Sequence, residues 1–389
     1  MKILKLVVKN GLRHKLRTFL TAIGIAIAVI AFALLSTIID AYFMGVEASS
    51  NTRLMTRNAV SLTFPLPLAY REKIARIPGV TTVSYGNWFG GTYIDQKHFF
   101  AQFAIEPESF LELYPELMLT GEEKQNFLRE RNSCIVGRKL AEKNKWELGS
   151  SITLIGTIFP GNWEFVIRGI YDGRDPATDE STMYFHWKYL DESLGLTAPG
   201  RTGRIGMFYV GVEDESQVVR ISQEIDALFD NSLAETKTET EKEFQLSFIA
   251  MVGTVITAVR IISVVVIAII LLVLANTMVM TARERISEYA VMKTLGFQPK
   301  HLIALIFGES TAIALLGGTL GILVTLPIIR GFAAFLTENL GSFFPVFELS
   351  PKTLALAATA SITVGLVAAL FPAWQAVRLN IADGLRRIG

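Results

Sequence analysis

Four long apolar runs divide the chain, and the polar segments between them differ greatly in length. The first run, Phe19–Ile39, contains 21 residues and no charge. At 1.5 Å per residue a helix of this length covers roughly 31 Å, enough to cross a bilayer core. The other runs are Ile261–Met280, Leu302–Ala334 and Leu354–Ala376. The pattern predicts an α-helical membrane protein with four transmembrane helices.

The segment between the first two runs has about 200 residues and a mixed pattern. Ala59–Phe64 alternates apolar and polar residues, which predicts a half-buried strand, and Met207–Val212 predicts another. Ser216–Phe229 has the spacing of an amphipathic helix. We therefore expect a mixed α/β extracytoplasmic domain between helices 1 and 2, with a smaller β-rich unit near residues 133–185.

An amphipathic lead-in from about Glu243 to Arg260 precedes the second apolar run. Together the two stretches predict one helix much longer than a bilayer is thick. Its first half would stand above the membrane as a stalk.

Basic residues are concentrated beside the apolar runs. Segments 1–18, 281–301 and 378–389 together carry 13 basic and 3 acidic residues, whereas segment 45–245 carries 21 basic and 29 acidic residues. Because basic flanks stay in the cytoplasm, both termini are predicted to be cytoplasmic and the large domain extracytoplasmic.

These considerations divide the chain into consecutive segments. They are a cytoplasmic amphipathic helix (1–18), the first spanning helix (19–40), the extracytoplasmic domain (41–245), a stalk with the second spanning helix (246–282), a cytoplasmic helix (283–300), the third spanning helix (301–335), an outer loop (336–352), the fourth spanning helix (353–377) and a cytoplasmic tail (378–389).

The segment Thr281–Gly296, TARERISEYAVMKTLG, combines a charged start with several apolar residues. Gly296 suits a helix C-terminus and Pro299 suits the first turn of the next helix. A short helix at the membrane face is therefore predicted, with an apolar side available to a partner. The alternative is a solvated cytoplasmic turn with basic anchors.

Composition excludes several classes of site. The single cysteine, Cys134, rules out an intramolecular disulfide and a cysteine cluster for metal binding, and the four histidines show no ligand spacing. Neither G-x-S-x-G nor the phosphate loop G-x-x-x-x-G-K-[ST] occurs. No catalytic, cofactor-binding, metal-binding or nucleic-acid-binding residues are predicted, and the chain is not expected to be an enzyme.

Two polar or aromatic features remain as candidates. Trp88, Phe89 and Tyr93 lie among glycines and could form a patch for an apolar ligand, or alternatively fill the domain core. Glu309 is a carboxylate inside the third apolar run, and such residues are functional candidates because a bare charge there is costly. The alternative is a structural role near the cytoplasmic end, in which Glu309 pairs with a basic residue or caps a neighbouring helix.

Small residues recur at helical spacing in two of the runs. Gly317 and Gly321 form G-x-x-x-G, and Gly24 with Ala28 forms a similar pair. Such surfaces let helix backbones approach closely. Packing within one chain and contact with a second copy are both open.

Several motifs together resemble one family. They are Asn10–Thr21 before the first run, Thr281–Gly296, Phe307–Ser310, Ala369–Arg378 and Ala382–Arg386, and, in the large domain, Val136–Ala141, Leu148–Ile152 and Ile167–Tyr171. Over essentially its whole length the chain resembles the membrane subunits of MacB/FtsX-type ABC transporters, which include the lipoprotein-releasing permeases.

The resemblance implies a place for Thr281–Gly296 and a set of partners. The segment would be the coupling helix, with contacts to an ATPase from Arg283, Glu284, Arg285, Glu288, Tyr289, Met292, Leu295 and Gly296. Because the chain starts directly at the membrane, the ATPase, with its ATP and Mg, is expected on a separate subunit. A second permease copy, identical or a related paralogue, is implied, and a periplasmic adaptor is a further candidate partner.

The implied function is ATP-driven export or extraction of an amphiphilic substrate, such as a lipoprotein, lipid, peptide or drug, from the bacterial inner membrane. The extracytoplasmic domain would move by mechanotransmission through the stalk. The alternative is a non-transporting regulator of an extracytoplasmic partner such as a cell-wall hydrolase.

Overall fold

The structure, a computed structural model, describes residues 15–47, 49–95, 98–175, 178–340 and 347–378. Most of the predicted cytoplasmic helix at 1–18 (residues 1–14), most of the predicted tail at 378–389 (residues 379–389) and residues 341–346 of the predicted outer loop at 336–352 lie outside the described residues. The chain forms two compact units. We call residues 1–40, 253–334 and 347–389 the helical bundle, and residues 41–252 the α/β domain.

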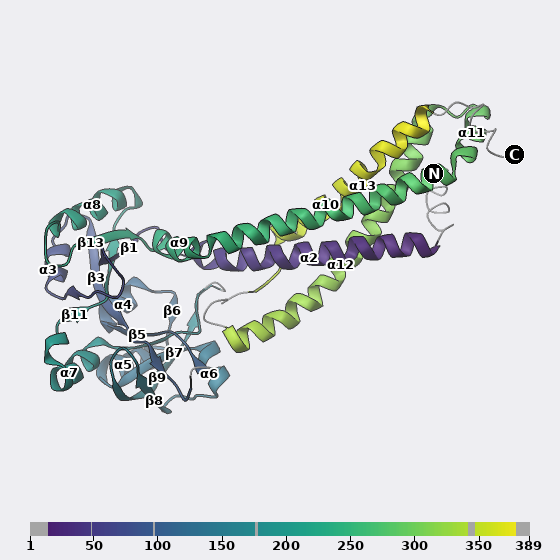
Figure 1. Ribbon diagram of the computed structural model, residues 1–389. Coiled ribbons are helices and arrows are strands. Elements are labelled where there is room, and N and C mark those ends of the chain that lie inside the picture. Colours follow the sequence, from purple (N-terminus) through teal and green to yellow (C-terminus); the bar gives the residue numbers. More distant parts are fainter. Residues whose placement is uncertain (1–14, 48, 96–97, 176–177, 341–346, 379–389) are drawn as a thin grey trace. The chain divides into compact units, whose positions relative to one another are not determined.

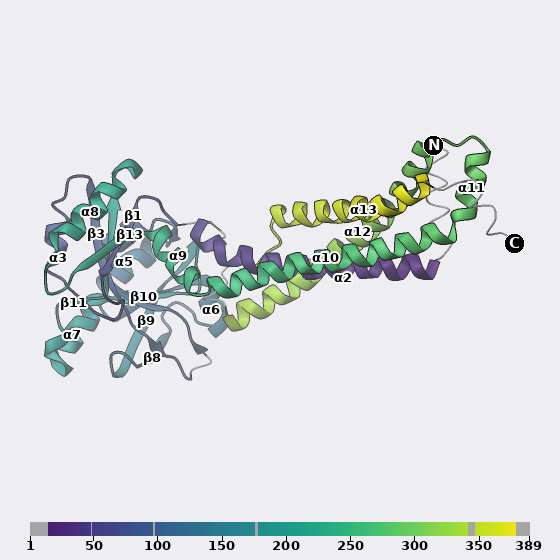
Figure 2. The same ribbon diagram turned by 45° about the horizontal axis from the view of Figure 1, so that its top comes forward.

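Four helices of the structure are long and apolar enough to cross a membrane. They are α2 (Lys15–Glu47), α10 (Gly253–Glu284), α12 (Pro299–Leu340) and α13 (Pro351–Arg378). Within the bundle they run alongside one another (Figures 1 and 2), with the short α11 (Ile286–Thr294) after α10. The four predicted transmembrane helices are therefore confirmed.

Apolar side chains from all four long helices form one buried cluster in the bundle. A polar contact joins the C-terminal part of α2 to the start of α13. The Asp40 carboxylate accepts hydrogen bonds from Ser350 Oγ at 2.7 Å and from Thr353 Oγ1 at 2.6 Å. Ser350 also caps α13, because its Oγ accepts the Thr353 N–H at 3.1 Å.

One sheet of eleven strands organises the α/β domain. Its order is β13-β1-β12-β3-β5-β10-β7-β9-β8-β4, and β6 pairs with β9. The strands are β1 (Arg53–Asn58), β3 (Val80–Trp88), β4 (Gly91–Thr92), β5 (Gln102–Ile105), β6 (Leu117–Met118), β7 (Ser133–Gly137), β8 (Ser151–Gly156), β9 (Gly161–Gly173), β10 (Met183–His186), β12 (Met207–Val212) and β13 (Thr236–Thr240), while β2 (Leu66–Pro67) and β11 (Arg204–Ile205) form a separate pair.

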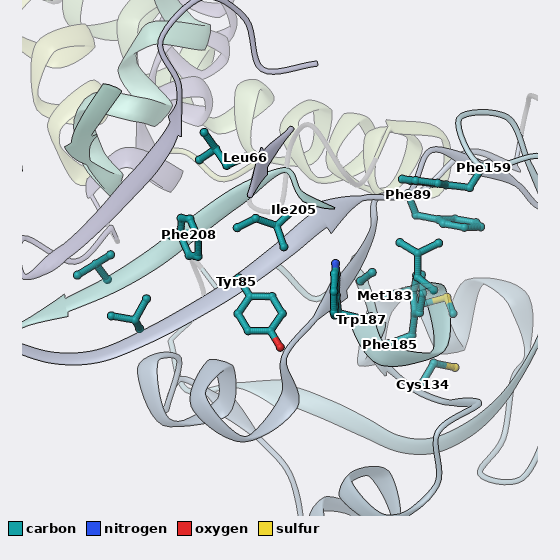
Figure 3. Packing of buried hydrophobic residues seen from close by; sticks show 14 of the residues in the cluster. Leu66, Tyr85, Phe89, Cys134, Phe159, Met183, Phe185, Trp187, Ile205 and Phe208 are labelled. Atoms are coloured by element: carbon teal, nitrogen blue, oxygen red, sulfur yellow. The ribbon is translucent and has the colours of Figure 1, made fainter. Parts of the chain in front are cut away.

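Helices accompany this sheet and two apolar clusters fill the domain. The helices are α3 (Tyr70–Ile74), α4 (Pro107–Leu113), α5 (Gly121–Arg129), α6 (Arg138–Asn144), α7 (Trp187–Thr197), α8 (Val218–Leu228) and α9 (Glu241–Met251). In the larger cluster the rings of Phe89 and Phe159 lie nearly parallel, with centroids 5.9 Å apart, and Phe185 meets Phe89 edge-on (Figure 3). The predicted mixed α/β domain is confirmed.

The predicted strand at Ala59–Phe64 is wrong. The strand is β1, one segment earlier, where Arg53–Asn58 pairs with both β12 and β13. Asn58 ends it, because its Oδ1 accepts the Val60 N–H at 2.9 Å and turns the chain. The alternating apolar residues that suggested a strand are exposed in this turn.

Two other expectations change. Strands within residues 133–185 do not form a unit of their own, because they are part of the single large sheet. The stalk is not one continuous helix, because α9 ends at Met251 and α10 begins at Gly253. Val252, between them, has φ −99° and ψ 8°, outside regular helix.

Candidate functional site

A separate short helix, α11, lies within the segment Thr281–Gly296. Helix α10 ends at Glu284, and Arg285 (φ −104°, ψ 13°) interrupts the helix before α11. At the far end Gly296 has φ +85°. The Phe297 N–H donates to Met292 O and the Gly296 N–H donates to Lys293 O, both at 3.1 Å, which is the Schellman arrangement.

One side of α11 is buried in the helical bundle. Tyr289 is 2% exposed and Ala290 is fully buried. Tyr289 lies in the apolar cluster of the four long helices. Burial raises the pKa of Tyr289 to about 12, although the nearby Arg285 opposes the shift, so the hydroxyl stays neutral at physiological pH.

Arg285 forms a buried ion cluster beneath α11. Its Nη1 lies 2.8 Å from Glu309 Oε2 and its Nε lies 2.9 Å from Glu288 Oε2. The guanidinium carbon is 5.4 Å from the centroid of the Tyr289 ring. Glu309 is thus paired with a basic residue, the simpler of the two roles considered for it. The pair fixes the break after α10 against α12, because either charge left alone in this buried place would be costly.

Two further contacts tie the same segment to the other helices. Arg17 of α2 donates to Glu284 Oε2 at 2.8 Å, at the end of α10. Lys293 Nζ of α11 donates to the Val377 carbonyl of α13 at 2.8 Å. Together with Arg285–Glu309, these bonds connect the α10–α11 region to α2, α12 and α13.

The opposite side of α11 is apolar and exposed. Val291 and Leu295 lie one helical turn apart, and Leu295 is 73% exposed. Phe297 follows at 47% exposure. A shallow groove beside them is lined by Ser287, Glu288, Val291 and Met292. We call Val291, Leu295 and Phe297 the exposed face of α11.

The predicted ATPase contacts fall into a buried group and a more accessible group. Arg285 and Tyr289 are buried, so their side chains hold α11 in place and are unavailable to a partner. Arg283, Glu284, Leu295 and Gly296 are exposed, and Glu288 and Met292 are half-buried. Val291 and Phe297 were not predicted. Apolar side chains occur on all sides of α11, so helical spacing alone did not show which side faces inward.

The glycines of the third apolar run face α2 within the same chain. A Cβ at Gly317 would lie 2.6 Å from Ile25 Cβ, and one at Gly321 would lie 2.8 Å from Val29 Cβ. Such distances are too short for a side chain, so the glycines permit the close approach of two helices. Gly24 faces Ile270 of α10, and the neighbouring Ala28 is buried in the same cluster.

The predicted aromatic patch separates into core and surface. Phe89 is fully buried, and Tyr93 packs against the same core and accepts a hydrogen bond from Trp146 Nε1 at 3.3 Å. Trp88 is 37% exposed and meets Phe103 edge-on, with centroids 5.1 Å apart. Only Trp88 of the three therefore offers substantial surface to a ligand.

Described residues contain no group of three or more His, Cys, Asp or Glu side chains arranged to hold a metal ion. Cys134, on β7, is buried, and burial raises the pKa of its thiol. A buried neutral thiol is a poor nucleophile.

Comparison with known proteins places both units in one family. Residues 18–228 match the MacB-like periplasmic core domain, which is more than half of the chain. Residues 260–381, with α11 among them, match the FtsX-like permease C-terminal domain. The chain belongs to the MacB/FtsX-like family of ABC transporter permeases.

Relatives of the permease differ in how much of it they share. An uncharacterized ABC transporter permease of Methanocaldococcus jannaschii is 25% identical over 97% of this chain and 96% of its own length. The macrolide export ATP-binding/permease protein MacB of Syntrophobacter fumaroxidans is 33% identical over 28% of this chain and 14% of its own. The extracellular domain of the ABC-type transporter YknZ of Gram-positive bacteria covers 48% of this chain at 17% identity, with a TM-score of 0.36. The family identifies the α/β domain as extracytoplasmic.

Proposed function

We propose that the permease receives mechanical work from an ABC ATPase through the exposed face of α11 and uses it to move its α/β domain. The observation that carries this proposal is that one side of α11 is buried and the other is exposed. One side is held by the Arg285–Glu309 ion pair, and the other presents Val291, Leu295 and Phe297 to the surroundings. A short amphipathic helix of this kind suits a groove in a partner protein.

The ATPase lies outside these 389 residues in this proposal, since they contain no phosphate loop. The relative matched along nearly its full length is named a permease, whereas those named ATP-binding/permease share only a small part of their length with this chain. ATP and Mg would accordingly bind to the partner. Both chain termini and α11 would lie on the cytoplasmic side of the bacterial inner membrane, as the basic flanks indicate.

Movement of α11 would reach several helices at once. Its bonds to α12 and α13, and the Arg17–Glu284 pair at the end of α10, connect the docking helix to the whole bundle. Along the chain α10 is preceded by α9 and the α/β domain. The substrate class that suits an extracytoplasmic domain worked in this way is amphiphilic: a lipoprotein, lipid, peptide or drug. Two permease copies would serve the two ATPases of an ABC transporter, and a periplasmic adaptor is a further candidate partner.

Co-purification tests the docking surface. The double substitution Val291→Asp and Leu295→Asp places two charges on the exposed face of α11 without touching its buried side. We expect it to abolish retention of the ABC ATPase that co-purifies with the unmodified protein from native membranes. Leu233→Asp is the matched control, because Leu233 is a fully exposed leucine in the α/β domain. ATPase retention that is unchanged by the double substitution, or lost equally in the control, would contradict the proposal.

A further inference from the structure

A second buried ion cluster lies in the α/β domain, around Arg53 on β1. Its Nε lies 2.9 Å from Glu241 Oε2 and its Nη2 lies 2.7 Å from Glu116 Oε1. Its Nη1 donates to the Leu113 carbonyl at 2.8 Å. The guanidinium carbon is 4.1 Å from the centroid of the Tyr114 ring. All three guanidinium nitrogens therefore have partners, which come from two different parts of the domain.

The cluster is buried, so its geometry is tightly fixed. Arg53 is 8% exposed and Glu241 is 7% exposed. A buried charge is stabilised only by well-placed partners, and removing one partner leaves the others unpaired. The position of Arg53 consequently depends on both glutamates, and each glutamate depends on Arg53.

Glu241 is the first residue of α9, so the cluster holds the start of this helix. Its Oε2 also accepts the Ser50 N–H at 3.1 Å, and its Oε1 accepts the Tyr114 hydroxyl at 3.2 Å. A carboxylate in the first turn is favoured by the helix dipole. The start of α9 and the chain entering β1 are thus held at one point.

Glu116 lies directly before β6, next to a part of the sheet that is distant from β1 in strand order. Its carbonyl accepts the Arg174 N–H at 2.9 Å, just beyond β9. The following strand β6 pairs with β9, with Leu117 opposite Gly173 and Met118 opposite Asp172. In the order of the sheet, five strands separate β1 from β9: β12, β3, β5, β10 and β7. The Arg53–Glu116 bond bypasses all five.

We infer that Arg53 is a positioning residue that connects the start of α9 to the β6–β9 side of the α/β domain. A displacement of α9 reaches β9 through Glu241, Arg53 and Glu116 without first deforming the intervening strands. The two sides of the sheet then respond together to a change at α9. This inference does not depend on what binds α11.

Hydrogen exchange measured by mass spectrometry on the full-length protein in detergent tests the connection. Arg53→Met keeps most of the side-chain length and removes the charge. We expect exchange to become at least about tenfold faster both at the start of α9 and around residues 172–174, since Glu241 and Glu116 each lose a charged hydrogen bond and the Glu116 carbonyl holds the Arg174 N–H. Arg57→Met is the matched control, because Arg57 is on the same strand and pairs with Glu239 of β13 at 3.0 Å. It should affect β1 and β13 alone.

Two further variants replace the glutamates at the two ends of this connection. Glu116→Gln should speed exchange at the start of α9, and Glu241→Gln should speed exchange around residues 172–174, because Arg53 joins the two glutamates. These variants decide the question even if Arg53→Met does not fold. Effects confined to the neighbourhood of each substitution, or an equal effect of Arg57→Met around residues 172–174, would overturn the inference.

Discussion

The two buried arginine clusters use the same components in different ways. Arg285 in the bundle and Arg53 in the α/β domain each bind two glutamates and lie over a tyrosine ring. Arg285 joins groups that are close in the chain, with Glu309 24 residues away. Arg53 joins groups 60 and 188 residues away. The first cluster holds a helix break, and the second joins distant segments of one domain.

Each arginine has one deeply buried glutamate partner and one more exposed glutamate partner. The side chains of Glu309 and Glu288 are 7% and 33% exposed, and those of Glu241 and Glu116 are 10% and 23% exposed. The clusters differ in a further bond, because Arg53 also donates to the Leu113 carbonyl. Replacing Arg53 therefore leaves a backbone carbonyl as well as a buried glutamate without its bond.

The largest expected effect tests this difference directly. Arg53→Met should lower the unfolding free energy of the α/β domain by about 3–5 kcal/mol, because it leaves Glu241 buried and unpaired. Arg285→Met should cost the bundle somewhat less, about 2–4 kcal/mol, because it leaves Glu309 unpaired but no backbone carbonyl without its bond. Urea denaturation followed by hydrogen exchange in peptides from each unit measures both. Equal losses in the two units would refute the comparison.

The second prediction concerns the close packing of α12 against α2 in the bundle. Gly317→Ala should destabilise the bundle by about 1–3 kcal/mol, because the added methyl would lie 2.6 Å from Ile25 Cβ. Gly331→Ala is the control on the same helix, where a Cβ meets nothing within 4 Å. It should be neutral or stabilise the helix by up to about 1 kcal/mol. Thermal denaturation in detergent compares the two, and similar melting temperatures would contradict the close-packing interpretation.

The smallest expected effect is a dependence of the stability of the α/β domain on pH. Burial lowers the pKa of His186 on β10, although its bond to the Phe127 carbonyl, 2.7 Å from Nε2, opposes the shift. Below the ordinary pKa of about 6.5, His186 is protonated in the unfolded chain but stays neutral in the folded domain until the pH falls further. The stability contributed by neutral His186 is present above that pH and is lost as the pH falls toward the lowered pKa of the folded state.

Between pH 7 and pH 5 the α/β domain should therefore lose up to about 1 kcal/mol of unfolding free energy. The measurement is urea denaturation at several pH values. His186→Gln should reduce the dependence on pH, since an amide can still donate to the Phe127 carbonyl but does not titrate. A pH profile unchanged by this substitution would exclude His186 as the cause.

Local patterns in the sequence predicted the elements whose signals are local. Long apolar runs identified the four long helices, and Gly296 with Pro299 marked the boundary between α11 and α12. The inward side of α11 was not predictable in this way, because Tyr289 and Leu295 are both large and apolar. The Arg53 cluster was missed because its partners are far apart in the chain. The break at Val252 had one local signal, Gly253, which is a poor residue for a helix interior.

The interruption at Val252 determines which kinds of motion can pass along the chain from α10 to α9. A pull along the chain is transmitted across it, because covalent geometry is nearly inextensible. A rotation of α10 about its own axis is not transmitted in the same way, since the backbone torsions at Val252 and Gly253 can absorb it. If α10 moves as proposed, this connection would pass tension to α9 and would absorb rotation of α10.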